Sequence, residues 1–225
     1  MNVLIIAAHP DDEVLGCGGT IARHAAAGDR VHILILAEGA TSRRDGGSSE
    51  EIEKLRDAAK QAAAALGAEA PRMLGFPDNK MDSLALLEIV QPIEAVINEI
   101  EPEIVYTHHG GDLNIDHRIT HQATLTACRA LPGATVKKLY AFEVVSSTEW
   151  SSDAFGGLFQ PTHFVDVSKH VAALKAAIDA YGIEMREAPH PRSWEILEAG
   201  LRVRGATSGL AAAEAFQVIR QIETN

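Results

Sequence analysis

Two short stretches of the sequence gather the residue types that bind metals and transfer protons. The first, HPDDE at residues 9–13, places a histidine and three acids directly after the apolar run of residues 3–8. The second, HHGGDLNIDHR at residues 108–118, follows the β-branched run of residues 103–108. Imidazole nitrogens and carboxylate oxygens bind divalent metals, and positioned carboxylates serve as general bases. Both stretches therefore predict chemistry where a buried strand ends.

Three residues of these stretches are the expected ligands of a metal site. His9, Asp12 and His117 supply two imidazoles and a carboxylate, a ligand set of catalytic zinc sites that keep a fourth position open for water. The neighbouring Asp11 is the expected general base, because a carboxylate beside such a water can take its proton. Pro10 fixes one backbone torsion and helps to divide the adjacent acids between these two tasks. The expected cofactor is Zn²⁺, although the same ligands suit other divalent transition metals.

The elements that must position these residues follow from the alternation of apolar runs with segments of helical period. This alternation is typical of βαβ units that build a parallel sheet. We expect strands at 3–8, 31–37, 103–108, 138–145 and 163–167, another before residue 78, and helices near 17–28, 49–67, 84–100, 117–131, 168–181, 193–204 and 209–215. The predicted fold is a Rossmann-like, doubly wound α/β domain with a mainly parallel sheet flanked by helices. Residues 1–145 form its core, and the strands and helices of residues 146–225 complete the single domain.

The expected strand order also predicts where the two stretches meet. In a doubly wound sheet the chain lays three strands outward and then places the fourth beside the first, which opens a crevice at their carboxyl ends. Residues 9–13 follow the first strand, and residues 108–118 follow the fourth. The two stretches should therefore face each other across this crevice.

Composition restricts the class of partner. The formal net charge is -11, which argues against nucleic acid or an anionic membrane surface as the main ligand. No apolar run approaches the roughly 20 residues that span a bilayer, so no membrane insertion is expected. The two cysteines, Cys17 and Cys128, do not form a CxxC pair and are expected to be reduced. The first residues lack the basic segment of a signal peptide, which favours the cytoplasm. The expected partner is a small-molecule substrate.

Several motifs together resemble a known family. The chain contains His9-Pro10-Asp11-Asp12-Glu13, then Gly16-Cys17-Gly18-Gly19-Thr20, and later Asp116-His117 after the fourth strand. In these motifs it resembles the LmbE-like (PIG-L) zinc N-deacetylases. The similarity continues through EGATSR (38–43), GFPDN (75–79), PHPRS (189–193), RG (204–205) and AEAF (213–216), nearly the whole chain. The resemblance implies hydrolysis of an N-acetylated amino sugar or glycoconjugate to acetate and a free amine. It also implies metal ligation by His9, Asp12 and His117, with Asp11 as the base.

One position departs from the family pattern. Members commonly read His-Pro-Asp-His where this chain reads NIDH, so that Asn114 stands in place of a histidine thought to stabilise the oxyanion or protonate the amine. Asn114 cannot be an acid, but its amide can donate a hydrogen bond to a developing oxyanion. Proton delivery then falls to one of four groups, among which the sequence does not choose: protonated Asp11, His108, His109 or His190.

Other polar residues near these motifs have less specific expectations. Asp116 is expected to orient an imidazole and not to bind the metal itself. Glu13 is expected only to favour the N-terminus of the first helix through its charge. His109 and His190 are candidates for substrate contact. For His190, which lies between two prolines, a turn is the alternative.

Residues after the second and third strands are candidates for binding the substrate. Arg43 would hold a phosphate or carboxylate, with a solvated loop as the equal alternative. Asp78 and Asn79 would bind sugar hydroxyls, although turns also favour these residue types.

Two other functions stay open at this point. The same site could hydrolyse another amide, such as an antibiotic precursor or a thiol-sugar conjugate. A non-hydrolytic nucleotide-binding or sugar-binding module on a Rossmann-like sheet would leave Asp11, Asp12 and His117 without a joint purpose. The Ala-rich helices and the 146–160 loop offer apolar surface that a homo-oligomer would bury.

Overall fold

A mixed sheet forms the centre of the molecule. The structure is a computed structural model that describes residues 1–39 and 48–223. Its strands are β1 (Asn2–Ala7), β2 (Arg30–Ala37), β3 (Arg72–Phe76), β4 (Ile104–His108), β5 (Lys138–Phe142), β6 (His163–Asp166) and β7 (Ala213–Gln221). Within the described residues they make one seven-stranded sheet in the order β3-β2-β1-β4-β5-β7-β6. Strands β1 to β5 pair in parallel, and β7 is antiparallel to both neighbours. The predicted doubly wound order is confirmed.

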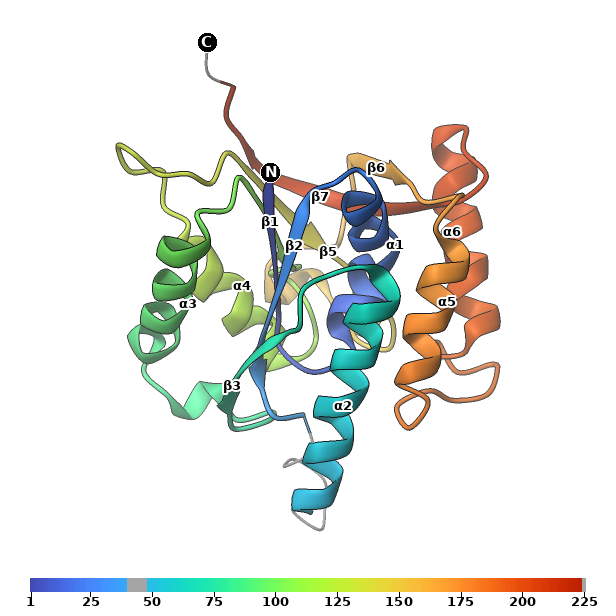
Figure 1. The fold of residues 1–225 in the computed structure, drawn as a ribbon, viewed down its shortest axis with the longest axis horizontal. Coiled ribbons are helices and arrows are strands. Elements are labelled where there is room, and N and C mark those ends of the chain that lie inside the picture. The colour runs from blue at the N-terminus through green and yellow to red at the C-terminus, as the bar shows by residue number, and fades with distance from the viewer. Residues whose placement is uncertain (40–47, 224–225) are drawn as a thin grey trace.

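Helices cover both faces of this sheet (Figure 1). They are α1 (Asp12–Ala26), α2 (Ser49–Leu66), α3 (Leu86–Ile100), α4 (Ile115–Ala127), α5 (Val171–Ala180) and α6 (Trp194–Ser208). Helices α3 and α4 pack on one face, whereas α1, α2 and α5 pack on the other, with α6 beside β6 and β7. No helix in the described ranges is long and apolar enough to cross a bilayer.

Strand β1 shows why the sheet needs both helical layers. Val3 and Ile5 belong to the hydrophobic cluster beneath α1 and α2, whereas Leu4 and Ile6 belong to the cluster beneath α3. All four side chains are fully buried. A central parallel strand buried on two faces is apolar at every position, which explains the unbroken run that precedes the first motif.

Helix α1 begins five residues before the predicted start at residue 17. It consists of two helical segments joined at a kink at Cys17, whose φ is -155° and ψ is 26°. The buried carboxylate of Glu214 accepts hydrogen bonds from the backbone N–H groups of Gly19 and Thr20, both at 2.7 Å. These groups begin the second segment, so Glu214 satisfies donors that a kinked helix leaves without intrahelical partners.

The predicted helix at residues 209–215 is wrong. Gly209, at φ 74°, ends α6, and β7 begins at Ala213. Phe216 pairs with Phe142 of β5 on one side and with His163 of β6 on the other. The Ala-rich sequence favours a helix locally, but pairing with two strands decides the structure.

Candidate metal and catalytic site

The adjacent strands β1 and β4 bring the two chemistry-bearing stretches together. Asp12 lies in the first turn of α1 and His117 in the first turn of α4, so both follow a strand closely. The Nδ1 of His9 and the Nε2 of His117 each lie 3.2 Å from Asp12 Oδ2. A pocket of about 220 Å³ opens over these groups, lined by His9, Pro10, Asp11, Gly39, Asp78, Asn79, Asn114, His117, Ser146, Ser147, Glu184 and Arg192.

The three residues predicted as ligands form a group that can hold a metal ion. One ligand atom from each of His9, Asp12 and His117 lies within 4.8 Å of the other two. Asp12 is fully buried, and its Oδ1 has no hydrogen-bond partner in the described part of the chain. Burial would raise the pKa of Asp12, but the charges of His117 and His108 hold it well below its usual range. A buried, ionised carboxylate with a spare oxygen between two imidazoles fits a divalent cation.

Asp116, expected to orient an imidazole, contacts His9. Its Oδ2 lies 3.1 Å from Nε2 of His9, the nitrogen that faces away from Asp12. The same carboxylate accepts the backbone N–H groups of Asn79, at 2.6 Å, and Met81, at 3.0 Å. Asp116 therefore ties the segment after β3 to the candidate metal ligand His9.

Asp112, which the sequence reasoning did not single out, occupies the corresponding place beside His117. Its Oδ1 lies 3.1 Å from Nδ1 of His117. Its carboxylate also accepts the hydroxyls of Ser147 and Thr148, the latter at 2.5 Å. Burial would raise the pKa of Asp112, but these contacts lower it to about 2. The only sequence signal was its place within the stretch 108–118.

Asp11, the predicted base, has an unusual backbone and a buried side chain. Its φ is 104°, a conformation that residues other than glycine rarely adopt. Its Oδ2 accepts a hydrogen bond from Nη1 of Arg192 at 2.6 Å. Burial raises the pKa of Asp11 to about 7, against the opposing charge of Arg192. A carboxylate with a pKa near neutrality suits a group that takes and returns a proton.

Glu13 does more than add charge to a helix terminus. Its buried carboxylate accepts the backbone N–H of Asp11 at 3.1 Å and the hydroxyl of Tyr181 at 2.7 Å. Burial raises the pKa of Glu13 to about 8. The expectation of a simple helix-terminus role was therefore incomplete, because the side chain folds back onto the residue that precedes α1.

Comparison with known proteins bears on this geometry. The sequence model of the family described as PIG-L, GlcNAc-PI de-N-acetylase, matches residues 4–128. The chain belongs to the PIG-L family. The Escherichia coli K12 protein named uncharacterized deacetylase YaiS is 30% identical over 78% of this chain and 87% of its own length. A Mycolicibacterium smegmatis 1D-myo-inositol 2-acetamido-2-deoxy-alpha-D-glucopyranoside deacetylase is 29% identical over 87% of this chain and 84% of its own length.

Solved structures show the same fold. The conserved protein TT1542 from Thermus thermophilus matches with a TM-score of 0.78 and 25% identity, over 99% of this chain and 96% of that one. GalB, a 4-carboxy-2-hydroxymuconate hydratase from Pseudomonas putida KT2440, matches with a TM-score of 0.79 and 22% identity, over 100% and 98%. The fold that PIG-L members share therefore also carries other chemistry, and the reaction must be argued from the site.

Asn114, where this PIG-L chain departs from the common family motif, begins α4. Its Oδ1 accepts the backbone N–H of Asp116 at 2.8 Å as an N-cap. Its Nδ2 donates to Oδ1 of Asn79 at 3.0 Å. Both residues line the pocket together with Asp78, whose Oδ1 lies 3.2 Å from Nε2 of His9. The structure thus brings these three predicted residues to the site.

Of the other predicted residues, His109 and His190 do not line this pocket, and Arg43 is not described. The Nε2 of His109 lies 3.0 Å from the carbonyl oxygen of Gly157. The Nδ1 of His190 accepts the backbone N–H of Arg192 at 3.1 Å. Arg43 lies outside the residues that the structure describes. Substrate contacts by these residues stay predictions.

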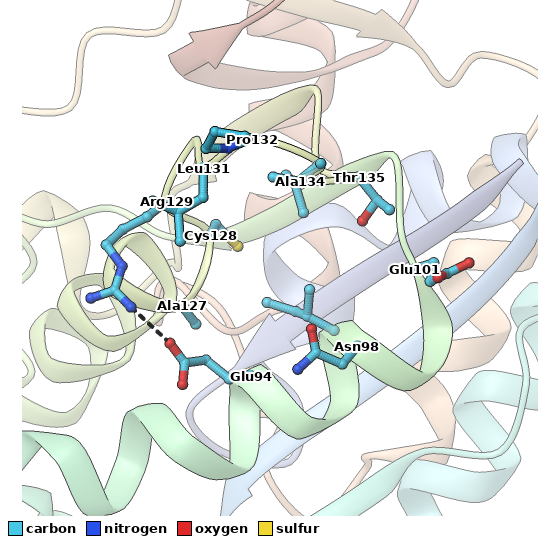
Figure 2. Close-up of a pocket in the computed structure, with 13 residues that line it drawn as sticks. Glu94, Asn98, Glu101, Ala127, Cys128, Arg129, Leu131, Pro132, Ala134 and Thr135 are labelled. Carbon is cyan, nitrogen blue, oxygen red and sulfur yellow. Dashed lines mark hydrogen bonds and ion pairs between the residues drawn. The ribbon is translucent and has the colours of Figure 1, made fainter.

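A second hollow, of about 450 Å³, lies between the end of α3 and residues 127–136 (Figure 2). These segments lead into the amino-terminal ends of β4 and β5. Glu94 and Arg129 form an ion pair at 3.1 Å across one side of it. None of the predicted ligand or base residues lines this hollow.

Proposed function

We propose that this protein is a zinc-dependent N-deacetylase that hydrolyses the acetamide of an N-acetylated amino sugar or glycoconjugate to acetate and a free amine. The observation that carries the proposal is that Asp11 lines one pocket with His9 and His117, which group with the buried Asp12 as possible metal ligands. The M. smegmatis relative, whose name states that it deacetylates an acetamido-glucopyranoside, supports the substrate class.

His9, Asp12 and His117 would hold the zinc ion. When bound there, Zn²⁺ supplies a water of lowered pKa and polarises the acetamide oxygen. Other divalent transition metals suit the same ligands, so the ion that the protein carries is decided by metal analysis.

Asp11 moves the protons of the reaction. Its carboxylate takes a proton from the water that attacks the acetamide carbon, with Arg192 holding its Oδ2 at 2.6 Å. When the C–N bond breaks, the proton passes to the departing nitrogen, which leaves as the amine. One residue can serve as base and then as acid because the proton that it takes from the water is the proton that the departing nitrogen needs.

Asn114 stabilises the charge that develops on the acetamide oxygen. Its Nδ2 carries two hydrogens, of which the contact with Asn79 uses one. An amide donor aimed at a developing oxyanion favours the transition state over the bound substrate. Asp78 and Asn79 provide oxygen and nitrogen atoms at the pocket wall for the sugar hydroxyls.

Acetate release from a substrate panel tests this function. The panel contains N-acetylglucosamine, N-acetylglucosaminyl inositol, diacetylchitobiose and N-acetylated amino acids, each incubated with zinc-loaded protein. We expect acetate from the sugars, and a loss of roughly 10²–10⁴-fold in Asp11→Asn. Asp57→Asn, at an exposed site on α2, is the matched control and should keep full activity.

Two results would contradict the proposal. Acetate from the amino acids alone would place the substrate among other amides. No acetate from any compound, together with metal-independent nucleotide binding, would favour a non-hydrolytic module.

We also propose that the enzyme acts in the cytoplasm as a homo-oligomer. Cys17 and Cys128 are free, buried thiols, which agrees with a reducing compartment. Trp150 and Leu158 expose 56% and 57% of their area in the loop after β5, apolar surface that a second copy would bury. Cell fractionation and light scattering during size exclusion test the two points separately.

A further inference from the structure

We propose that Glu13 and Arg192 are positioning residues that hold Asp11 in its reactive geometry, Glu13 through the backbone and Arg192 through the carboxylate. This inference rests on the proposed deacetylase function, in which Asp11 is the base. Neither residue touches the acetamide in this account, and both act through Asp11. The carrying observation is that a backbone conformation that residues other than glycine rarely adopt coincides with two ionisable hydrogen-bond partners, the buried Glu13 and the part-buried Arg192.

The backbone of Asp11 needs support from its surroundings. Its φ of 104° and ψ of -30° lie outside the regions that an L-residue adopts without strain. Such a conformation persists only where surrounding contacts determine it. Glu13 Oε2 accepts the Asp11 N–H at 3.1 Å, and the Asp11 carbonyl accepts the N–H groups of Val14 and Leu15 at 3.0 and 2.9 Å. The peptide groups on both sides of Asp11 are thus fixed.

Glu13 is itself held in place. Its Oε1 accepts the hydroxyl of Tyr181, at 2.7 Å, from the end of α5. Both residues are only 1% exposed. A carboxylate fixed at both oxygens positions its partner more precisely than a solvated one, because it has no other conformation to adopt.

Arg192 fixes the side chain of Asp11. Its Nη1 donates to Asp11 Oδ2 at 2.6 Å, and its Nε donates to Ser146 Oγ at 2.8 Å. The planar guanidinium is therefore held at two points, and the Asp11 side chain is 5% exposed. This contact occupies Oδ2 and leaves Oδ1 as the oxygen that can accept the proton of the attacking water.

The same loop that holds Arg192 also reaches the metal ligands. Glu149 accepts the backbone N–H groups of Ser146 and Ser147 at 2.6 and 3.2 Å. The hydroxyl of Ser147 donates to Asp112, which contacts His117. One loop thus fixes the base relative to a metal ligand, and a displacement of the base by about 1 Å is the kind of change that costs roughly 10²-fold in rate.

The alternative is that Arg192 binds substrate directly, since it lines the pocket. The two roles differ in kinetics. Loss of a substrate contact used equally in the ground and transition states raises KM and leaves kcat unchanged. Loss of a positioning residue lowers kcat and leaves KM nearly unchanged.

The test compares Arg192→Ala and Arg192→Lys with wild-type protein, all loaded with zinc. We expect kcat to fall roughly 10²-fold in Arg192→Ala, with KM within about threefold of wild type and unchanged zinc content. Added guanidinium should restore part of the activity of this variant, whereas lysine should restore little because it lacks the planar fork. Tyr181→Phe, which frees one oxygen of Glu13, should lower kcat to a smaller degree. Arg202→Ala, on the exposed surface of α6, is the control.

Three outcomes would overturn the inference. They are an unchanged kcat in Arg192→Ala, a rise in KM alone, and a loss of activity that guanidinium does not restore although zinc is retained. If the wild-type protein releases no acetate from any substrate, the proposed function fails. The positioning role is then tested by urea unfolding of Asp11→Ala, Arg192→Ala and the double variant. Non-additive changes in stability would support the contact, and additive changes would overturn it.

Discussion

His117 lies between two carboxylates, with Nε2 3.2 Å from Asp12 Oδ2 and Nδ1 3.1 Å from Asp112 Oδ1. A histidine that binds metal through one nitrogen is commonly oriented by a carboxylate at the other. Asp112 therefore lies where it would orient the ring of a metal-bound His117.

This relationship predicts the effect of Asp112→Asn. The variant should bind zinc roughly 10- to 100-fold more weakly, because the ring loses its charged partner while the three ligands remain. Competition with a chromogenic chelator measures the affinity. Wild-type affinity in this variant would show that Asp112 only supports the loop, whereas Asp57→Asn should not change the affinity in any case.

Asn114 combines a structural and a proposed catalytic role, which two substitutions separate. Asn114→Asp keeps an N-cap acceptor for α4 but removes the amide donor, so acetate release should fall while stability stays near wild type. Asn114→Ala should lose activity and, in addition, about 1 kcal/mol of stability. Urea unfolding and acetate release are measured on both. Full activity in Asn114→Asp would exclude an oxyanion contact by the amide.

Glu214 predicts a dependence of stability on pH. Burial raises the pKa of Glu214 to about 7, although the N–H groups of Gly19 and Thr20 oppose the shift. In the unfolded chain the pKa is about 4.3, so between these values the folded state holds more protons than the unfolded state. The contribution of Glu214 is therefore complete below about pH 4 and is lost as the pH rises through about 7.

The variant Glu214→Gln tests this dependence. The difference in free energy of unfolding between the variant and wild type should shift in favour of the variant by on the order of 1–3 kcal/mol from pH 5 to pH 8. The reason is that only the wild type loses the contribution of Glu214 over this range. Urea unfolding at both pH values, with Glu195→Gln as an exposed control, measures the change. A constant difference between variant and wild type at both pH values would show that Glu214 does not titrate in this range.

Two glycines offer a matched test of packing around α1. A Cβ at Gly16 would lie 2.3 Å from Cδ2 of Phe142, whereas a Cβ at Gly200 in α6 would meet nothing within 4 Å. Gly16→Ala should cost about 1–3 kcal/mol through overpacking. Gly200→Ala should be neutral or stabilising by about 1 kcal/mol, because alanine favours a helix. Equal thermal midpoints for the two variants would contradict this packing.

The sequence predicted the features that depend on local residue patterns and on the order of strands in the sheet. The β-branched runs and helical periods placed β1, β2, β4 and α2 within a few residues, and the strand order brought residues 9–13 beside residues 108–118. Parallel strands end at a common edge, so motifs that directly follow strands can be combined without coordinates.

Contacts between distant segments could not be predicted in this way. Arg192 lies 181 positions after Asp11 and comes from a segment between α5 and α6 with no regular period. Likewise, Glu214 was expected within the helix at residues 209–215, but β7 pairs with β5 and β6 and carries it to the kink in α1. Local propensity does not report such tertiary pairing.

The most direct test of the metal-dependent account is the zinc content of wild-type, Asp12→Ala and Asp57→Ala proteins, measured by elemental analysis on the preparations used for acetate release. We predict about one zinc per chain in wild type and in Asp57→Ala, and almost none in Asp12→Ala, with acetate release following the zinc content. Zinc-free wild-type protein that added zinc does not activate, or an Asp12→Ala variant that retains both metal and activity, would contradict the account.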